Sequence, residues 1–156
     1  MKHLLTTCLL IILRLSVLGQ ADSSKLFESS KGKWPIPVSK YLKIYDNENL
    51  KLFTSNQFDS TLRIIMDSSY QVTAVHDGTV TEVIKVGGEY TVLTKFGNYF
   101  ISYSRLKKPK IVKGVYLRAG QQLGHVIKDW TENNYTLEIS LSKGEKQLSA
   151  ENWIDW

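Results

Sequence analysis

Few side chains in this sequence of 156 residues could bind a metal ion or act as a nucleophile. The chain has three histidines, His3, His76 and His125, and one cysteine, Cys8. A catalytic zinc site needs about three histidine, cysteine or carboxylate ligands and a further position open to water. His76 and His125 each lie beside a glycine turn, and we interpret both as ordinary surface histidines. No nucleophile elbow, phosphate-binding loop or paired-carboxylate motif offers another catalytic route.

Basic side chains concentrate in one short stretch of the chain, where they interleave with Tyr103 and Tyr116. One interpretation is a basic lip that meets an anionic polymer. The other is a solvated loop, which Pro109 amid the lysines is equally consistent with. The residues of this candidate lip are Lys107, Lys108, Lys110, Lys113 and Arg118.

The first nineteen residues differ in composition from the rest of the chain. Lys2 gives a charged start, residues 4–13 are almost all apolar, and small residues follow. This layout is typical of a secretory signal peptide at 1–19, with cleavage after Gly19 or Ala21. The apolar run is shorter than the roughly 20 residues that a transmembrane helix needs. We therefore predict export to the periplasm or the cell exterior, with no transmembrane span in the mature chain.

Removal of residues 1–19 would lower the formal net charge from +5 to +3, because they carry Lys2 and Arg14 and no acid. A mildly basic chain suits an anionic surface, and nucleic acid is not an expected partner. Cys8 would leave with the same segment, so packing rather than a disulfide must stabilise the mature chain. A composition of 42% hydrophobic and 22% charged residues is typical of a folded domain and not of a disordered chain.

Glycine turns divide the rest of the chain into short β-rich runs. Gly-Gly and Gly-Asn pairs stand between runs of alternating apolar and polar residues, and such pairs favour hairpins because glycine readily adopts a positive φ. The segment 135–141 alternates most clearly. We predict an all-β fold, a sandwich or half-barrel of short antiparallel strands in one domain over 34–156, preceded by a polar leader arm at 20–33.

Five segments follow one another in the order of a known family pattern. They read V-x-A-x-x-D-G-x-V, Y-x-x-L, V-x-G with a later G-Q-x-L-G, T-L-E-I-S, and a final W-I, and they lie at 72–80, 103–106, 112–124, 136–140 and 150–154. Together they resemble the M23 family of peptidoglycan endopeptidases, the LytM or lysostaphin type. The resemblance covers nearly all of the predicted domain and implies a fold like the duplicated hybrid motif.

The resemblance also implies a zinc site that this chain does not reproduce. In the family, zinc is bound by a histidine, by the aspartate of a G-I-D-I strand and by the second histidine of H-L-H, whose first histidine acts on the water. The stretch 41–60, where the first ligand is expected, has no histidine. Arg63 stands at the aspartate, Arg105 at the histidine of Y-x-H-L, and Thr136 and Glu138 at the two histidines of H-L-H. We treat these four as vestigial groove positions, since arginine has no lone pair for a metal.

Two of the vestigial positions are expected to form an ion pair. Apolar residues alternate along 61–66 and 135–141 and face the core, so Arg63 and Glu138 face away from it. In the family these two positions converge on one metal ion. We therefore predict a charge-assisted hydrogen bond between Arg63 and Glu138 in place of zinc coordination.

Three hypotheses for the function follow from the resemblance. The first is a non-catalytic envelope domain without zinc or catalytic residues, which binds peptidoglycan or regulates a cell-wall hydrolase. The second is a zinc metalloendopeptidase with a rebuilt site. The third is a structural envelope domain with no ligand in the groove. Zinc content separates the second hypothesis from the others, and binding to peptidoglycan separates the first from the third.

Overall fold

A computed structural model of the chain describes residues 23–46, 60–129, 131 and 133–156. The predicted signal peptide at 1–19 lies outside these residues. Among the residues that are described, no helix is both long and apolar enough to cross a bilayer.

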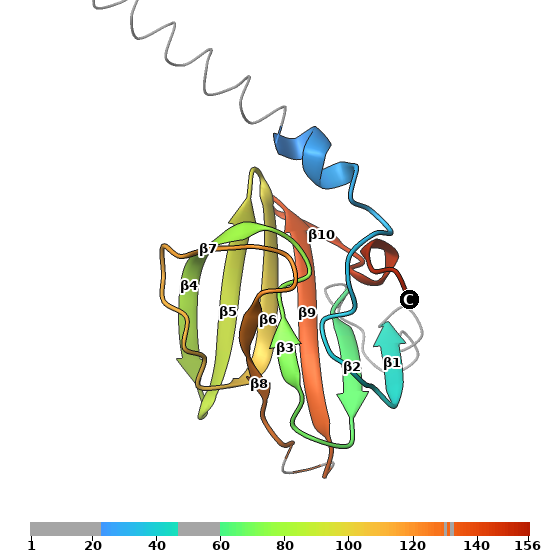
Figure 1. Ribbon diagram of the computed structural model, residues 1–156, viewed down its shortest axis with the longest axis vertical. Coiled ribbons are helices and arrows are strands. Elements are labelled where there is room, and N and C mark those ends of the chain that lie inside the picture. The colour runs from blue at the N-terminus through green and yellow to red at the C-terminus, as the bar shows by residue number, and fades with distance from the viewer. Residues whose placement is uncertain (1–22, 47–59, 130, 132) are drawn as a thin grey trace, which may run out of the picture.

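Nearly all regular structure is antiparallel β-sheet, so the predicted all-β fold is confirmed (Figure 1). The short 3-10 helix η2 covers Glu151–Trp153 near the C-terminus. The strands are β1 Lys43–Asp46, β2 Leu62–Met66, β3 Gln71–Thr73, β4 Gly78–Val86, β5 Glu89–Phe96, β6 Tyr99–Lys107, β7 Tyr116–Leu117, β8 Gln122–Val126, β9 Tyr135–Lys143 and β10 Lys146–Leu148.

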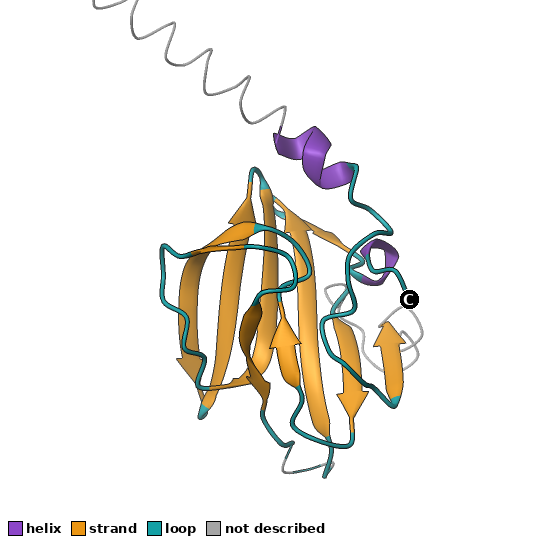
Figure 2. Cartoon of the chain, in the orientation of Figure 1, coloured by secondary structure: helices purple, strands orange, loops and turns teal. Residues whose placement is uncertain are grey.

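The main sheet has the strand order β1-β2-β9-β6-β5-β4-β7 (Figure 2). β10 pairs with β9, and β8 pairs with both β3 and β6. Strand β6 runs beside β9 as far as Ser104, opposite Glu138, and then continues beside β8, where Leu106 lies opposite Val126. The sheet therefore branches at this point of β6. The end of β6 pairs with β8, and β8 pairs with β3.

The register of β2 and β9 decides which side chains face the core. Ile64 lies opposite Leu137 and Leu62 opposite Ile139, and all four are fully buried. Because side chains alternate along a strand, a slip of one residue would turn this apolar set to the outside. The alternation that the sequence predicts is thus present, and it turns the intervening residues of both strands to the opposite face.

The segment predicted as a polar leader arm contributes to the core. Residues 23–28 are helical, and Phe27 is fully buried. Its ring stacks on that of Tyr99 with a centroid distance of 3.9 Å, and it also contacts Trp34 and Trp153 at 5.4 and 5.0 Å. The expectation of a plain polar arm is therefore wrong at Phe27, which closes one end of the core.

Polar contacts hold the same helix in place. The carboxylate of Glu28 accepts hydrogen bonds from the Tyr99 hydroxyl and from Lys143 Nζ, the latter at 2.6 Å. The hydrogen bond from Lys143 is the main cause that lowers the pKa of Glu28. The helix is thus tied to β6 and β9 by both an aromatic and a charged contact.

The entry and exit of the domain are joined by backbone pairing. The Trp34 N–H donates to the Trp153 carbonyl at 2.9 Å, and the Asp155 N–H donates to the Trp34 carbonyl at 2.9 Å. These bonds form a parallel bridge between Trp34 and Ile154. The segment around Trp34 and the C-terminal segment, far apart in sequence, therefore lie side by side.

Candidate functional site

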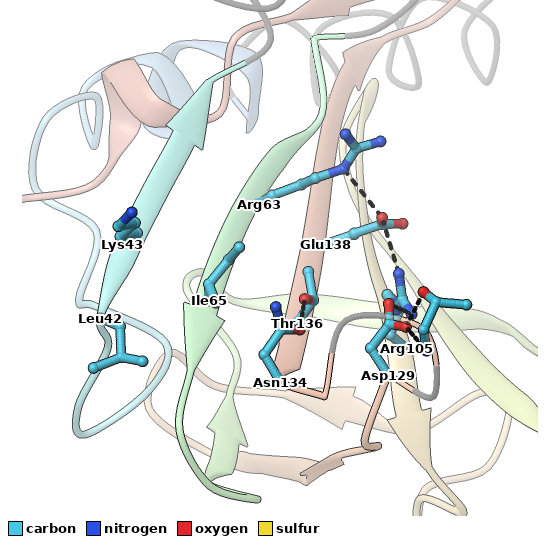
Figure 3. Close-up of a pocket in the computed structure, with 10 residues that line it drawn as sticks. Leu42, Lys43, Arg63, Ile65, Arg105, Asp129, Asn134, Thr136 and Glu138 are labelled. Atoms are coloured by element: carbon cyan, nitrogen blue, oxygen red, sulfur yellow. Dashed lines mark hydrogen bonds and ion pairs between the residues drawn. The ribbon is translucent and has the colours of Figure 1, made fainter.

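A groove of about 780 Å³ opens on the face of the sheet opposite the core (Figure 3). Its floor is formed by β2 and β9, where Arg63 lies opposite Glu138 and Ile65 opposite Thr136. The structure brings all four vestigial positions to this groove. The lining residues are Leu42, Lys43, Arg63, Ile65, Arg105, Asp129, Thr131, Asn134, Thr136 and Glu138.

The ion pair predicted between Arg63 and Glu138 is present. Arg63 Nε donates to Glu138 Oε1 at 3.2 Å across the β2–β9 ladder. The two side chains are 34% and 26% exposed, so water only partly screens their attraction. In the family, the side chains at these two positions bind the same metal ion; in this chain they form a hydrogen-bonded ion pair with each other.

We expect Arg63 and Glu138 to be coupled by about 1 kcal/mol, between the values typical of exposed and of buried ion pairs. The measurement is a double-mutant cycle of R63M and E138Q, followed by urea unfolding. The more exposed pair Lys113–Glu82, with side chains 68% and 49% exposed, is the matched control and should give about 0.5 kcal/mol or less. Equal coupling in the two cycles would contradict a partly buried pair in the groove.

A second arginine enters the groove from β6. Arg105 Nη2 donates to Asp129 Oδ2 and lies 3.8 Å from Glu89 Oε1, while Nη1 lies 3.8 Å from Glu138 Oε1. Figure 3 shows Glu138 between the guanidinium groups of Arg63 and Arg105. The groove therefore contains a continuous charge network in which each arginine is held by at least one carboxylate.

The backbone at Arg105 is unusual and explains how this side chain reaches the groove. Ser104 and Arg105 together lie opposite Thr91, which makes a β-bulge in the β5–β6 ladder. Arg105 has φ +66°, a region that costs a non-glycine residue about 1–2 kcal/mol. Its buried Nε has no hydrogen-bond partner among the described residues. Strain and an unsatisfied donor at one residue are typical of a position that is maintained for its side chain.

Asp129 belongs to this network, although no pattern in the sequence indicates it. It is 7% exposed and accepts hydrogen bonds from the backbone N–H and the hydroxyl of Thr131, at 2.8 and 2.6 Å. Aspartate two residues before threonine is typical of an Asx turn, so the turn itself was open to prediction. Nothing in that motif indicates that its carboxylate would meet Arg105.

Thr136 occupies the position at which the family has the histidine that acts on water. It is 3% exposed, and its hydroxyl donates to Asn134 Oδ1 at 3.1 Å. A threonine hydroxyl is not a base at neutral pH. This position therefore offers hydrogen bonding to a ligand and no proton transfer.

Neither His76 nor His125 lines the groove. His125 is exposed on β8, as expected. The expectation for His76 is wrong, because its ring packs 4.4 Å from Phe27 and 4.9 Å from Phe96, and its Nδ1 donates to the Asp77 carbonyl at 2.7 Å. Burial among these rings lowers the pKa of His76. His76 is thus half-buried and packs against aromatic residues of the core.

The five residues of the candidate lip are all exposed, and none of them lines the groove in the described part of the chain. Lys113 is held by Glu82 at 2.5 Å. Lys107 ends β6, while Lys108 and Lys110 follow it in the loop that leads to β7. The lip and the groove are therefore separate surfaces.

The groove does not fit a catalytic zinc ion. Two of the aligned positions carry a guanidinium, which would repel a divalent cation, and a third carries a threonine hydroxyl. Within the described ranges, no group of three or more histidine, cysteine or acidic side chains is placed to hold a metal. The carboxylates of Glu138 and Asp129 already accept hydrogen bonds from arginine.

The sequence of the chain matches the model of a known protein family. Residues 57–150 match the model of peptidase family M23. The chain belongs to peptidase family M23. The groove of this M23 chain therefore corresponds to the face on which the family pattern places its zinc strand.

Several solved structures share the fold of this M23 chain. Csd3 from Helicobacter pylori aligns with a TM-score of 0.61 and 17% identity, over 78% of this chain and 34% of that one. A chain of the SpoIIIAH–SpoIIQ complex gives 0.56 and 18%, over 74% and 90%. The deep-sea M23 metalloprotease Pseudoalterin gives 0.55 and 16%, over 78% of both chains. This chain spans about one third of the length of Csd3, and no curated protein matches it.

Proposed function

We propose that this M23 chain is a non-catalytic domain of the bacterial cell envelope that binds peptidoglycan in its groove without cutting it. The observation that carries the proposal is the Arg63–Glu138 ion pair at two positions where the family pattern has zinc ligands. The chain would be exported by its predicted signal peptide. No zinc is expected to bind.

The groove has the volume and the mixed lining that ligand binding needs, but it lacks the electrophile and the base that cleavage of an amide needs. Hydrolysis of an amide requires a Lewis acid or other electrophile at the carbonyl and a base that activates water. Arg63 and Arg105 are occupied by carboxylates, and Thr136 replaces the histidine that acts on water. A groove of this volume, lined by both apolar and polar side chains, is nevertheless typical of a ligand site.

The candidate lip would add long-range attraction to an anionic envelope polymer. Its five cations are exposed between the end of β6 and the residue that follows β7, and they increase the local positive potential. Such attraction depends on salt, because exposed charges are screened beyond about 8 Å at physiological ionic strength. The lip therefore assists encounter, while the groove supplies the specific contacts.

Regulation of a cell-wall hydrolase is the second candidate function. A chain with this fold forms part of the SpoIIIAH–SpoIIQ complex, which favours a protein partner as an alternative to peptidoglycan. Binding of the purified chain to sacculi that have been stripped of protein separates the two candidates.

The purified mature chain is expected to sediment with stripped sacculi, to release no peptides from them and to contain no stoichiometric zinc. The physical reason is the replacement of the aligned zinc ligands by the Arg63–Glu138 pair. Metal analysis, pelleting and release of amino groups are the measurements. One tightly bound zinc per chain, with chelator-sensitive release, would overturn the proposal.

A triple variant, K107E/K108E/K110E, separates the lip from the groove in the same assay. It should weaken pelleting at low salt, and wild type and variant should converge as salt rises. Pelleting that is unaffected at low salt would show that these lysines serve solubility alone.

A further inference from the structure

The charges at the floor of the groove are paired with one another. Among the described residues, the guanidinium groups of Arg63 and Arg105 lie against the carboxylates of Glu138, Asp129 and Glu89, and the exposed Lys43 lies apart from them on β1. Both arginines are engaged within this set, Arg63 with Glu138 and Arg105 with Asp129. A charged ligand at the floor would have to displace one member of a pair and leave the other without compensation in a partly buried site. This pairing therefore favours an uncharged ligand at the floor.

The remaining walls of the groove are neutral. One side is apolar, with Leu42 and the outward-facing Ile65, and Leu42 is 56% exposed. The other side has the hydroxyls of Thr131 and Thr136 and the amide of Asn134. Figure 3 shows Leu42 toward β1 and Asn134 toward the start of β9, with Ile65 and Thr136 opposite each other on the floor between them. A ligand that fits must have an apolar surface beside groups that both donate and accept hydrogen bonds.

We propose that the groove binds the glycan strand of peptidoglycan and not its stem peptide, an inference that rests on the proposed function. Sugar rings of the N-acetylhexosamine type combine an apolar ring face with hydroxyl and acetamido groups and carry no charge. The hydroxyls can bond to the outer lone pairs and N–H groups of the arginine–carboxylate network without separating its members. Stem peptides instead carry carboxylate and ammonium groups.

The test is a titration of the mature chain with chitotetraose and, separately, with a synthetic stem pentapeptide, followed by amide chemical shifts. Chitotetraose should shift the amides of Ile65, Thr136 and Glu138 at the groove floor. Its affinity should change less than about twofold between low and physiological salt, because screening acts only on charges. The pentapeptide should bind at least about tenfold more weakly.

Two matched variants assign the contact to the groove. L42S removes an exposed apolar side chain from the groove wall and should weaken chitotetraose binding about fivefold. V112S removes a similar side chain, 66% exposed and outside the groove lining, and should leave binding unchanged. Since both side chains are exposed, both variants should fold.

The outcomes separate this inference from the proposed function. Groove shifts with chitotetraose that L42S weakens and V112S does not would support the glycan ligand. Groove shifts with the pentapeptide alone, together with pelleting on sacculi, would overturn the glycan ligand and leave the proposed function intact. Failure to pellet on sacculi and to bind either probe would overturn both.

Discussion

Replacing Phe27 by alanine is expected to lower the free energy of unfolding by about 4 kcal/mol, the range for a large aromatic residue removed from a core. Phe27 is fully buried, stacks on Tyr99 and contacts Trp34 and Trp153. A cavity at this place would loosen the helix over 23–28 and expose the aromatic rings beneath it. Urea unfolding measures the loss, and tryptophan fluorescence of the native state reports the change around Trp34 and Trp153.

The matched control is the preceding residue in the same helix. Leu26 is 64% exposed, so L26A should change stability by no more than about 0.5 kcal/mol. If F27A were as stable as L26A, the helix would contribute nothing to the core. The predicted leader arm at 20–33 would then add nothing to the stability of the domain.

The sequence did not predict this role of Phe27 for a physical reason. A helix of six described residues presents no full hydrophobic period, and Phe27 is an isolated aromatic residue in a polar stretch. What buries it are Tyr99, Trp34 and Trp153, which come from distant parts of the chain. The burial of His76 is hidden in the sequence for the same reason, since the rings that contact it come from distant parts of the chain.

The floor of the groove, in contrast, could be predicted from alternation. In β2 and β9 every second residue is apolar, so the direction of Arg63 and Glu138 follows once the strands are recognised. The family pattern supplied their pairing, and the register places them directly opposite each other. Local periodicity and one resemblance were therefore sufficient for this half of the site.

The other half could not be predicted, because it depends on a bulge and on long-range contacts. The resemblance places Arg105 in the groove, but nothing in the sequence indicates that Asp129 and Glu89 are its partners. The bulge at Ser104 and Arg105 turns the side chain toward them, and no residue type in that stretch signals a bulge. Glycine would have been such a signal, but the position with φ +66° holds arginine.

Replacing Arg105 by alanine should lower the free energy of unfolding by about 3 kcal/mol, because it removes the partner of a nearly buried carboxylate. Asp129 is 7% exposed, and Glu138 and Glu89 also lie within 4 Å of the Arg105 guanidinium. Without Arg105 these three carboxylates would face one another with less compensation. K107A, two residues further along the same strand and exposed, should change stability by about 0.5 kcal/mol or less.

Two further substitutions separate the charge of Arg105 from its backbone strain. R105G should be more stable than R105A by about 1 kcal/mol, since glycine adopts φ +66° without strain. Adding D129N to R105A should recover part of the loss, because it removes the carboxylate that R105A leaves without its partner. If R105G alone restored wild-type stability, backbone strain and not the charge network would determine the behaviour of this position. Partial recovery in R105A/D129N, with R105G still well below wild type, would instead show that the charge network determines the behaviour of this position.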